Sequence, residues 1–133
     1  MRQDIDKKRI NGIIQDAAIV FCLIIIKRRN ALYKLDDKHF YWDINKNMIN
    51  INKHGVSFKE AASVFSDVDA LYFNDEAHSS SEERFIVIGR SKKLKLLMVC
   101  HCYRNGDTMI RLISARKANR LEISQYEKEV RYE

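Results

Sequence analysis

The stretch "LKLLMVCHCYRNGDTMIRLISA", residues 94–115, contains the two strands that we expect at the centre of the fold. Residues 94–104 are almost wholly apolar in their middle, which is typical of a central strand. Asn105 and Gly106 form the sequence Asn-Gly, a strong signal for a type I′ hairpin turn. Residues 107–115 should therefore return as the neighbouring antiparallel strand.

A two-residue turn here implies a definite register between the strands. Arg104 would pair with Asp107, and Cys100 would pair with Arg111. An arginine in mid-strand is unfavourable to bury without a partner, so the side of the sheet that carries Arg111 should be the open one. His101 would then lie on the buried side, and we expect a core histidine there rather than a general base.

The elements around this hairpin predict an α+β domain. Its sheet should be mainly antiparallel and have four to five strands, with two helices on the N-terminal side and one C-terminal helix. Asp43 should cap the first helix and Gly55 end it, while Ser57 and Glu60 form a capping box for the second. Ile44, Met48 and Ile51 give the first helix an apolar stripe. The expected strands are 39–42, 70–75, 83–89, 94–104 and 107–115, and the expected helices are about 44–53, 58–65 and 116–133.

The charge is unevenly distributed along the chain, whose net charge is +6. Residues 57–83 carry seven acidic side chains and one basic one, whereas residues 84–120 carry ten basic side chains and one acidic one. A run of charge is usually a solvated face. Because this basic block spans several strands, it favours a surface that binds an acidic partner such as nucleic acid.

The cysteines and histidines predict reduced thiols and no metal site. Cys100 and Cys102 lie two apart on one strand, where an ordinary disulfide does not form, and Cys22 makes the number odd. We therefore expect reduced thiols and a cytoplasmic protein. The four histidines are too scattered to complete a zinc site with the Cys-His-Cys sequence.

Residues 1–38 form a segment whose role the sequence leaves open. Its apolar run "AAIVFCLIII", residues 17–26, is shorter than the roughly 20 residues that span a bilayer. The segment could be an extra core element, a membrane-proximal segment or an upstream extension outside the functional unit. We favour the extension, which makes residues 39–133 the functional domain.

Three sequence motifs resemble the BrnT family of bacterial toxins. The pattern W-D-x-x-K-x-x-x-N-x-x-K-H-G-V-S-F runs from Trp42 to Phe58, E-E-R-F-x-x-I-G from Glu82 to Gly89, and I-R-x-I-S-A-R-x-A from Ile110 to Ala118. The resemblance covers residues 40–127. It implies a RelE-like fold and the toxin of a type II toxin–antitoxin system, which cleaves RNA without a metal or cofactor. It also implies a BrnA-type antitoxin partner, whose ribbon-helix-helix module would provide the only, indirect contact with operator DNA, and no association with a membrane.

With this resemblance, the basic residues become candidates for RNA cleavage by attack of the 2′-OH. Arg84, Arg111 and Arg116 would hold the scissile phosphate, because guanidinium groups bind phosphate through two hydrogen bonds. The general base stays open between Lys53, His54, Glu83 and Tyr126. Further RNA contacts would come from Arg90, Lys92, Lys93, Lys117, Arg120 and Trp42, although core packing is the better interpretation of Trp42.

Three alternatives remain at this stage. The arginines could form a structural ion-pair network, with Glu83 beside Arg84 as its best acidic member. The same basic face could also belong to a non-catalytic module that binds nucleic acid or an acidic peptide. A structural role in which residues 17–26 drive assembly is a third possibility.

Overall fold

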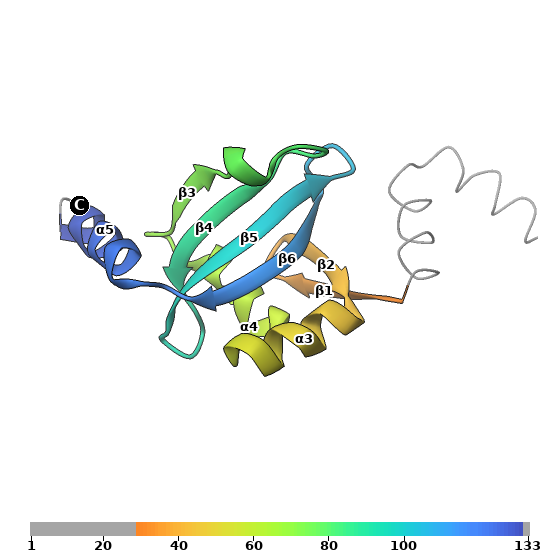
Figure 1. Ribbon diagram of the computed structural model, residues 1–133, viewed down its shortest axis with the longest axis horizontal. Coiled ribbons are helices and arrows are strands. Elements are labelled where there is room, and N and C mark those ends of the chain that lie inside the picture. The colour runs from red at the N-terminus through yellow and green to blue at the C-terminus, as the bar shows by residue number, and fades with distance from the viewer. Residues whose placement is uncertain (1–28, 132–133) are drawn as a thin grey trace, which may run out of the picture.

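A six-stranded sheet forms the centre of the computed structural model, which describes residues 29–131 (Figure 1). The predicted α+β class is confirmed, but the expected count of four to five strands is wrong. The spatial order is β1-β2-β6-β5-β4-β3. Neighbouring strands are antiparallel except β2 and β6, so the sheet is mixed. The strands are β1 (Asn30–Leu35), β2 (Lys38–Asp43), β3 (Leu71–Asn74), β4 (Phe85–Arg90), β5 (Leu96–Arg104) and β6 (Met109–Lys117).

The additional strand is β1, which lies within the segment that we assigned to an N-terminal extension. It pairs with β2 along its whole length. Its Tyr33 packs against Trp42 at 5.9 Å between ring centroids, so β1 contributes to the core as well as to the sheet edge. The apolar run 17–26 lies outside the described residues.

Two helices cover one face of the sheet. They are α3 (Ile44–His54) and α4 (Phe58–Ser63), and a short 3-10 turn, η1 (Val64–Ser66), follows α4. Figure 1 shows them below β5 and β6, while α5 (Arg120–Arg131) extends from the end of β6 at one end of the molecule. The core between helices and sheet includes Phe40, Trp42, Phe58, Val64, Phe65, Val87, Leu97, Val99 and Leu112.

The predicted helix caps are present. The Asp43 side chain accepts a hydrogen bond from the backbone N–H of Lys46 at 3.0 Å, and Gly55 ends α3 with φ of 68°. Ser57 Oγ accepts from the backbone N–H of Glu60 at 3.0 Å. Only this half of the capping box forms, because the Glu60 carboxylate accepts from Ser91 Oγ at 2.9 Å instead.

The apolar stripe of α3 points to solvent. Ile44, Met48 and Ile51 are 47%, 59% and 40% exposed, whereas Asn50 is buried against the sheet. The Asn50 amide donates to the carbonyl oxygens of Val56 and Ala115, both at 2.8 Å, and its oxygen accepts from the Ala115 N–H at 3.1 Å. Because β2 pairs with β6 only as far as Arg111, Asn50 takes the place of a strand partner for Ala115.

The predicted register of the β5–β6 hairpin is wrong by two residues. Arg104 pairs with Met109, and Arg111 pairs with Cys102 rather than Cys100. The turn is longer than expected because Asp107, like Asn105, adopts a positive φ, 67° and 55° respectively. A shift of two residues leaves the side chains of residues 109–112 on their predicted faces.

His101 lies in the core, as predicted. Its ring is fully buried and lies 4.8 Å from Phe65 and 5.4 Å from Tyr103 between centroids. Within residues 29–131 its Nε2 has no hydrogen-bond partner. Burial lowers the pKa of His101 from 6.5 to about 4, so the folded protein holds this histidine neutral at physiological pH.

Replacing Asn50 with alanine should lower the free energy of unfolding by about 3 kcal/mol, because the backbone of Ala115 loses its buried partner. Met48→Ala on the exposed stripe of the same helix is the matched control and should change stability by less than about 0.5 kcal/mol. Urea denaturation measures both. Equal effects of the two substitutions would contradict this role of Asn50.

Stability should decrease as the pH falls from 6.5 to about 4, because His101 binds a proton in the unfolded chain but not in the folded one. The lowering of its pKa corresponds to roughly 3 kcal/mol over this range. The His101→Phe variant, which retains an aromatic ring, should lose this part of the pH dependence. Urea denaturation of both proteins at pH 7 and pH 4.5 measures the difference, and parallel curves would refute the assignment.

Candidate functional site

A β-bulge brings arginines of β6 onto one face of the sheet. Cys100 pairs with Ser114 and His101 pairs with Leu112, so β6 has one extra residue at Ile113. Arg111 and Arg116 are five residues apart, and an unbroken strand would place them on opposite faces. The extra residue places both on the face that the helices α3 and α4 leave uncovered.

Three arginines meet around one carboxylate on this uncovered face. Glu82 Oε1 lies 3.7 Å from Arg84 Nε and 3.5 Å from Arg111 Nη1, while Glu82 Oε2 accepts a hydrogen bond from Arg104 Nη2. Arg104 comes from β5, Arg111 from β6, and Arg84 directly precedes β4. We call these four residues the arginine cluster. One carboxylate cannot neutralise three guanidinium groups, so the cluster carries an excess of positive charge.

Tyr41 of β2 lies beneath this cluster. It pairs with Arg111 in the parallel ladder, and its hydroxyl forms a hydrogen bond with Arg104. Burial raises the pKa of Tyr41. Burial alone would lower the pKa of Arg104, but the hydrogen bond with Tyr41 and the neighbouring acidic groups raise it, so Arg104 stays charged.

Arg84 retains an unused hydrogen-bond donor. Its Nε is buried and has no hydrogen-bond partner within residues 29–131. The ion pair with Glu82, at 3.7 Å, is too long to be a hydrogen bond. A buried donor without a partner is unfavourable, and an oxyanion ligand would satisfy it.

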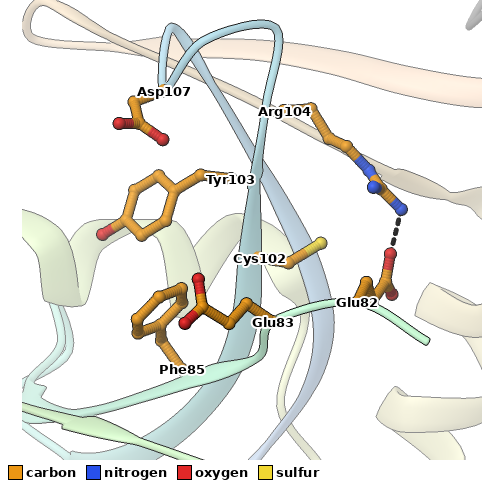
Figure 2. Close-up of a pocket in the computed structure, with 7 residues that line it drawn as sticks. All are labelled: Glu82, Glu83, Phe85, Cys102, Tyr103, Arg104 and Asp107. Carbon is orange, nitrogen blue, oxygen red and sulfur yellow. Dashed lines mark hydrogen bonds and ion pairs between the residues drawn. The ribbon is translucent and has the colours of Figure 1, made fainter. Parts of the chain in front are cut away.

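A hollow of about 420 Å³ opens beside the cluster, where β5 runs past the start of β4. Figure 2 shows Glu82 and Arg104 on one side of β5, together with Cys102. The side chain of Glu83 lies on the other side, with Phe85 and Tyr103. The acidic residue that meets the arginines is therefore Glu82, whereas the sequence analysis proposed Glu83.

Strand alternation could have identified Glu82 from the sequence. Side chains two residues apart in an extended chain lie on the same face, so Glu82 shares a face with Arg84 and Glu83 does not. The same alternation places Arg104 with Cys102 and thus with Arg111. Arg104 was not among the predicted site residues, because the predicted hairpin register paired it with Asp107.

Arg116 belongs to a separate ion pair. Its guanidinium donates to both oxygens of Glu122, at 2.8 Å and 3.0 Å. Glu122 also accepts from the Asn119 N–H, and its own N–H donates to Asn119 Oδ1, which forms a reciprocal cap. This cap starts α5 at Arg120, so the prediction of a helix from residue 116 is wrong.

The two described cysteines are poor nucleophiles. Burial, reinforced by nearby Asp75, raises the pKa of Cys100 to about 11. Burial also raises the pKa of Cys102. Both thiols therefore stay protonated near neutral pH.

Several predicted site residues lie away from the arginine cluster. Lys53 and His54 end α3, which packs on the covered face of the sheet. Tyr126 is buried and donates to Asp67 Oδ2 at 2.7 Å, and burial with this hydrogen bond raises its pKa to about 12. Trp42 is only 6% exposed and packs in the core, so it is not available to stack on a base.

The remaining basic candidates are exposed. Lys92 and Lys93 lie in the β4–β5 turn, at the opposite end of β5 from Arg104, and Lys93 Nζ is 4.0 Å from Glu60. Arg90 lies over the ring of Tyr126 at 5.8 Å. Lys117 and Arg120 follow the cluster along β6 toward α5.

Within residues 29–131, no three His, Cys, Asp or Glu side chains gather in a way that could hold a metal ion. No helix in this part of the chain is long and apolar enough to cross a membrane.

Comparison with known proteins identifies one family. A family model described as "Ribonuclease toxin, BrnT, of type II toxin-antitoxin system" matches residues 42–122, which is more than half of the chain. A 1.1 Å crystal structure of the Brucella abortus ribonuclease toxin BrnT aligns at 27% identity, covering 59% of this chain and 94% of that chain, with a TM-score of 0.46. No curated protein matches the chain.

In a Cys22→Ser background, a thiol reagent at pH 8 should label Cys100 and Cys102 only after the protein is unfolded. The Cys100 pKa of about 11 leaves roughly one Cys100 thiol in a thousand ionised at this pH, and burial also raises the pKa of Cys102. The labelling rate of the folded protein should rise as the pH approaches 11. Rapid labelling of either thiol in the folded protein at pH 8 would contradict the assignment.

Proposed function

The chain belongs to the BrnT family of ribonuclease toxins of type II toxin–antitoxin systems, and we propose that its arginine cluster grips the RNA phosphate at which cleavage occurs. The observation that carries this proposal is the convergence of Arg84, Arg104 and Arg111 around Glu82 on the uncovered face. In this proposal, the ribonuclease activity uses the uncovered face of the sheet and these three arginines.

The chemistry that suits these residues is attack by the 2′-OH of the RNA on the adjacent phosphorus. RNA supplies this nucleophile itself, so the enzyme needs no covalent intermediate and, in this proposal, no metal. It needs a base for the 2′-OH proton and cations for the charge that builds on the phosphate. The products would be a 2′,3′-cyclic phosphate and a 5′-hydroxyl.

The charge balance of the cluster supports this role. In the absence of RNA, Glu82 holds the three guanidinium groups near one another and limits their repulsion. When a phosphate enters, its oxygens would take guanidinium donors, among them the unpaired Arg84 Nε. The excess positive charge would then stabilise the transition state more than the ground state.

Further basic residues would extend the RNA surface. Lys117 ends β6 and Arg120 begins α5, and both are exposed. Arg90, Lys92 and Lys93 would add contacts at the β4–β5 turn. We leave Trp42 out of the surface because it is buried.

The partner would be a BrnA-type antitoxin with a ribbon-helix-helix module, which alone would contact operator DNA. We propose that an acidic segment of the antitoxin covers the arginine cluster and so blocks access of RNA. The fold would be of the RelE type, and the system would act in the cytoplasm.

Arg84→Lys and Arg111→Lys should each lower the rate of cleavage of a single-stranded RNA oligonucleotide by about 100-fold, because lysine keeps the charge but loses the planar fork. Arg131→Lys, an exposed change at the end of α5, is the matched control and should keep the wild-type rate. End analysis of the products should find cyclic phosphate and 5′-hydroxyl termini in the presence of EDTA.

Three results would contradict the proposal. They are products with 3′-hydroxyl ends, loss of cleavage in EDTA, and unchanged rates in both lysine variants. Binding of the oligonucleotide without cleavage by the wild-type protein would instead favour the non-catalytic basic module.

A further inference from the structure

The loop between β3 and β4 holds an aspartate–histidine pair. His78 Nδ1 lies 3.0 Å from both carboxylate oxygens of Asp75. The side chain of Asp75 is 11% exposed, whereas that of His78 is 68% exposed. A largely buried carboxylate therefore orients an accessible imidazole.

This pair lies on the same face as the arginine cluster. Asp75 Oδ2 is 3.8 Å from Cys100 Sγ, and Cys100 is on the uncovered face of β5, one step along from Cys102. Arg84 influences the pKa of both cysteines, so it lies close to both. Asp75 and the cluster thus share one strip of β5.

The backbone ties the pair to Arg84. The Asp75 N–H donates to the carbonyl of Arg84 at 2.9 Å, which closes the loop. Ser79 Oγ donates to the Asp75 carbonyl at 2.6 Å and accepts from the Arg84 N–H at 3.0 Å. A single set of hydrogen bonds therefore places His78 relative to a phosphate-gripping arginine.

The orientation of the ring suits a base. In a neutral imidazole only one of the two nitrogens carries a proton. Their hydrogen-bond partners determine which nitrogen that is. A proton on Nδ1 is held by Asp75, so the lone pair of Nε2 is available to a substrate. This is the arrangement by which a carboxylate orients a catalytic histidine in hydrolases.

We propose that His78 is the general base that removes the proton from the attacking 2′-OH, and that Asp75 positions it; this inference rests on the proposed function. The proton moves from the 2′-OH to Nε2 as the O2′–P bond forms. The P–O5′ bond breaks, and the leaving 5′-oxygen takes a proton from water. His78 then returns its proton to solvent.

The other titratable groups near the cluster are less suited to this role. Glu82 is engaged with three guanidinium groups, and Glu83 points to the other side of β5. Cys100 is a protonated thiol, and His54 ends a helix on the covered face. His78 is the candidate that combines exposure with an orienting carboxylate.

The test compares two substrates of the full-length protein, an RNA oligonucleotide and the same oligonucleotide with sulfur in place of the bridging 5′-oxygen at the cleavage site. His78→Gln should lower the cleavage rate of both by 100-fold or more, because both need a base for the 2′-OH. A sulfur leaving group does not need protonation. A defect that disappears on the sulfur substrate would identify a general acid and overturn the proposal.

Two further measurements separate catalysis from structure. Added imidazole should restore cleavage to His78→Ala, and the melting temperature of either variant should be that of the wild type, since the ring is mostly exposed. Asp75→Asn should lower kcat more than it raises KM, whereas Glu76→Gln, an exposed neighbour in the same loop, should change neither. Absence of imidazole rescue would argue against a direct role of the ring.

Comparison with an arginine variant gives a last criterion. The groups that face His78 and Asp75 are Cys100 of β5 and Arg84 before β4, with Glu82 beyond Arg84. If Arg84→Lys lowers the cleavage rate while His78→Gln keeps the wild-type rate, the proposed function stands and this inference fails.

Discussion

The extra residue at Ile113 is the constraint on which the rest of the site depends. It lets β6 direct Leu112 and Ala115 into the core while Arg111 and Arg116 both stay on the uncovered face. In a regular strand, whose side chains alternate strictly, Arg111 and Arg116 would lie on opposite faces. The irregularity is supported from the side by Asn50, which supplies Ala115 with the hydrogen bonds that no neighbouring strand offers. The helix layer therefore stabilises the strand geometry that the basic face requires.

The arginine cluster holds three like charges close together because Glu82 lies among them. Three guanidinium groups on neighbouring strands would repel one another without Glu82. With it, each arginine has a partner, yet the side chains stay 27–35% exposed and the charge is not balanced. Arg116 illustrates the other outcome, because Glu122 occupies both prongs of its fork. The same residue type on the same face thus shares one carboxylate in the cluster and forms a closed ion pair with α5 elsewhere.

Local signals in the sequence predicted local structure correctly, and errors arose where distant contacts decide. Asp43, Gly55 and Ser57 act within one helical turn, so their caps could be read directly. The sequence did not reveal which face of α3 is buried. The polar face packs on the sheet because Asn50 hydrogen-bonds to Ala115 of β6, 65 residues further along the chain. The hairpin register depended on the positive φ of Asp107, which an Asn-Gly pair does not reveal. The choice of Glu83 over Glu82 was a failure to apply strand alternation, and the sequence contained the information needed.

The residues of the proposed site lie partly on strands and partly in a loop. Strands β5 and β6 hold Arg104 and Arg111, which must resist their mutual repulsion and so need a stiff support. The proposed base, His78, lies in the loop between β3 and β4. The two parts are joined at Arg84, whose backbone is hydrogen-bonded to Asp75 and Ser79 and whose side chain enters the cluster. The phosphate contact and the base that we propose are therefore both positioned through Arg84. Displacement of the loop would disturb both.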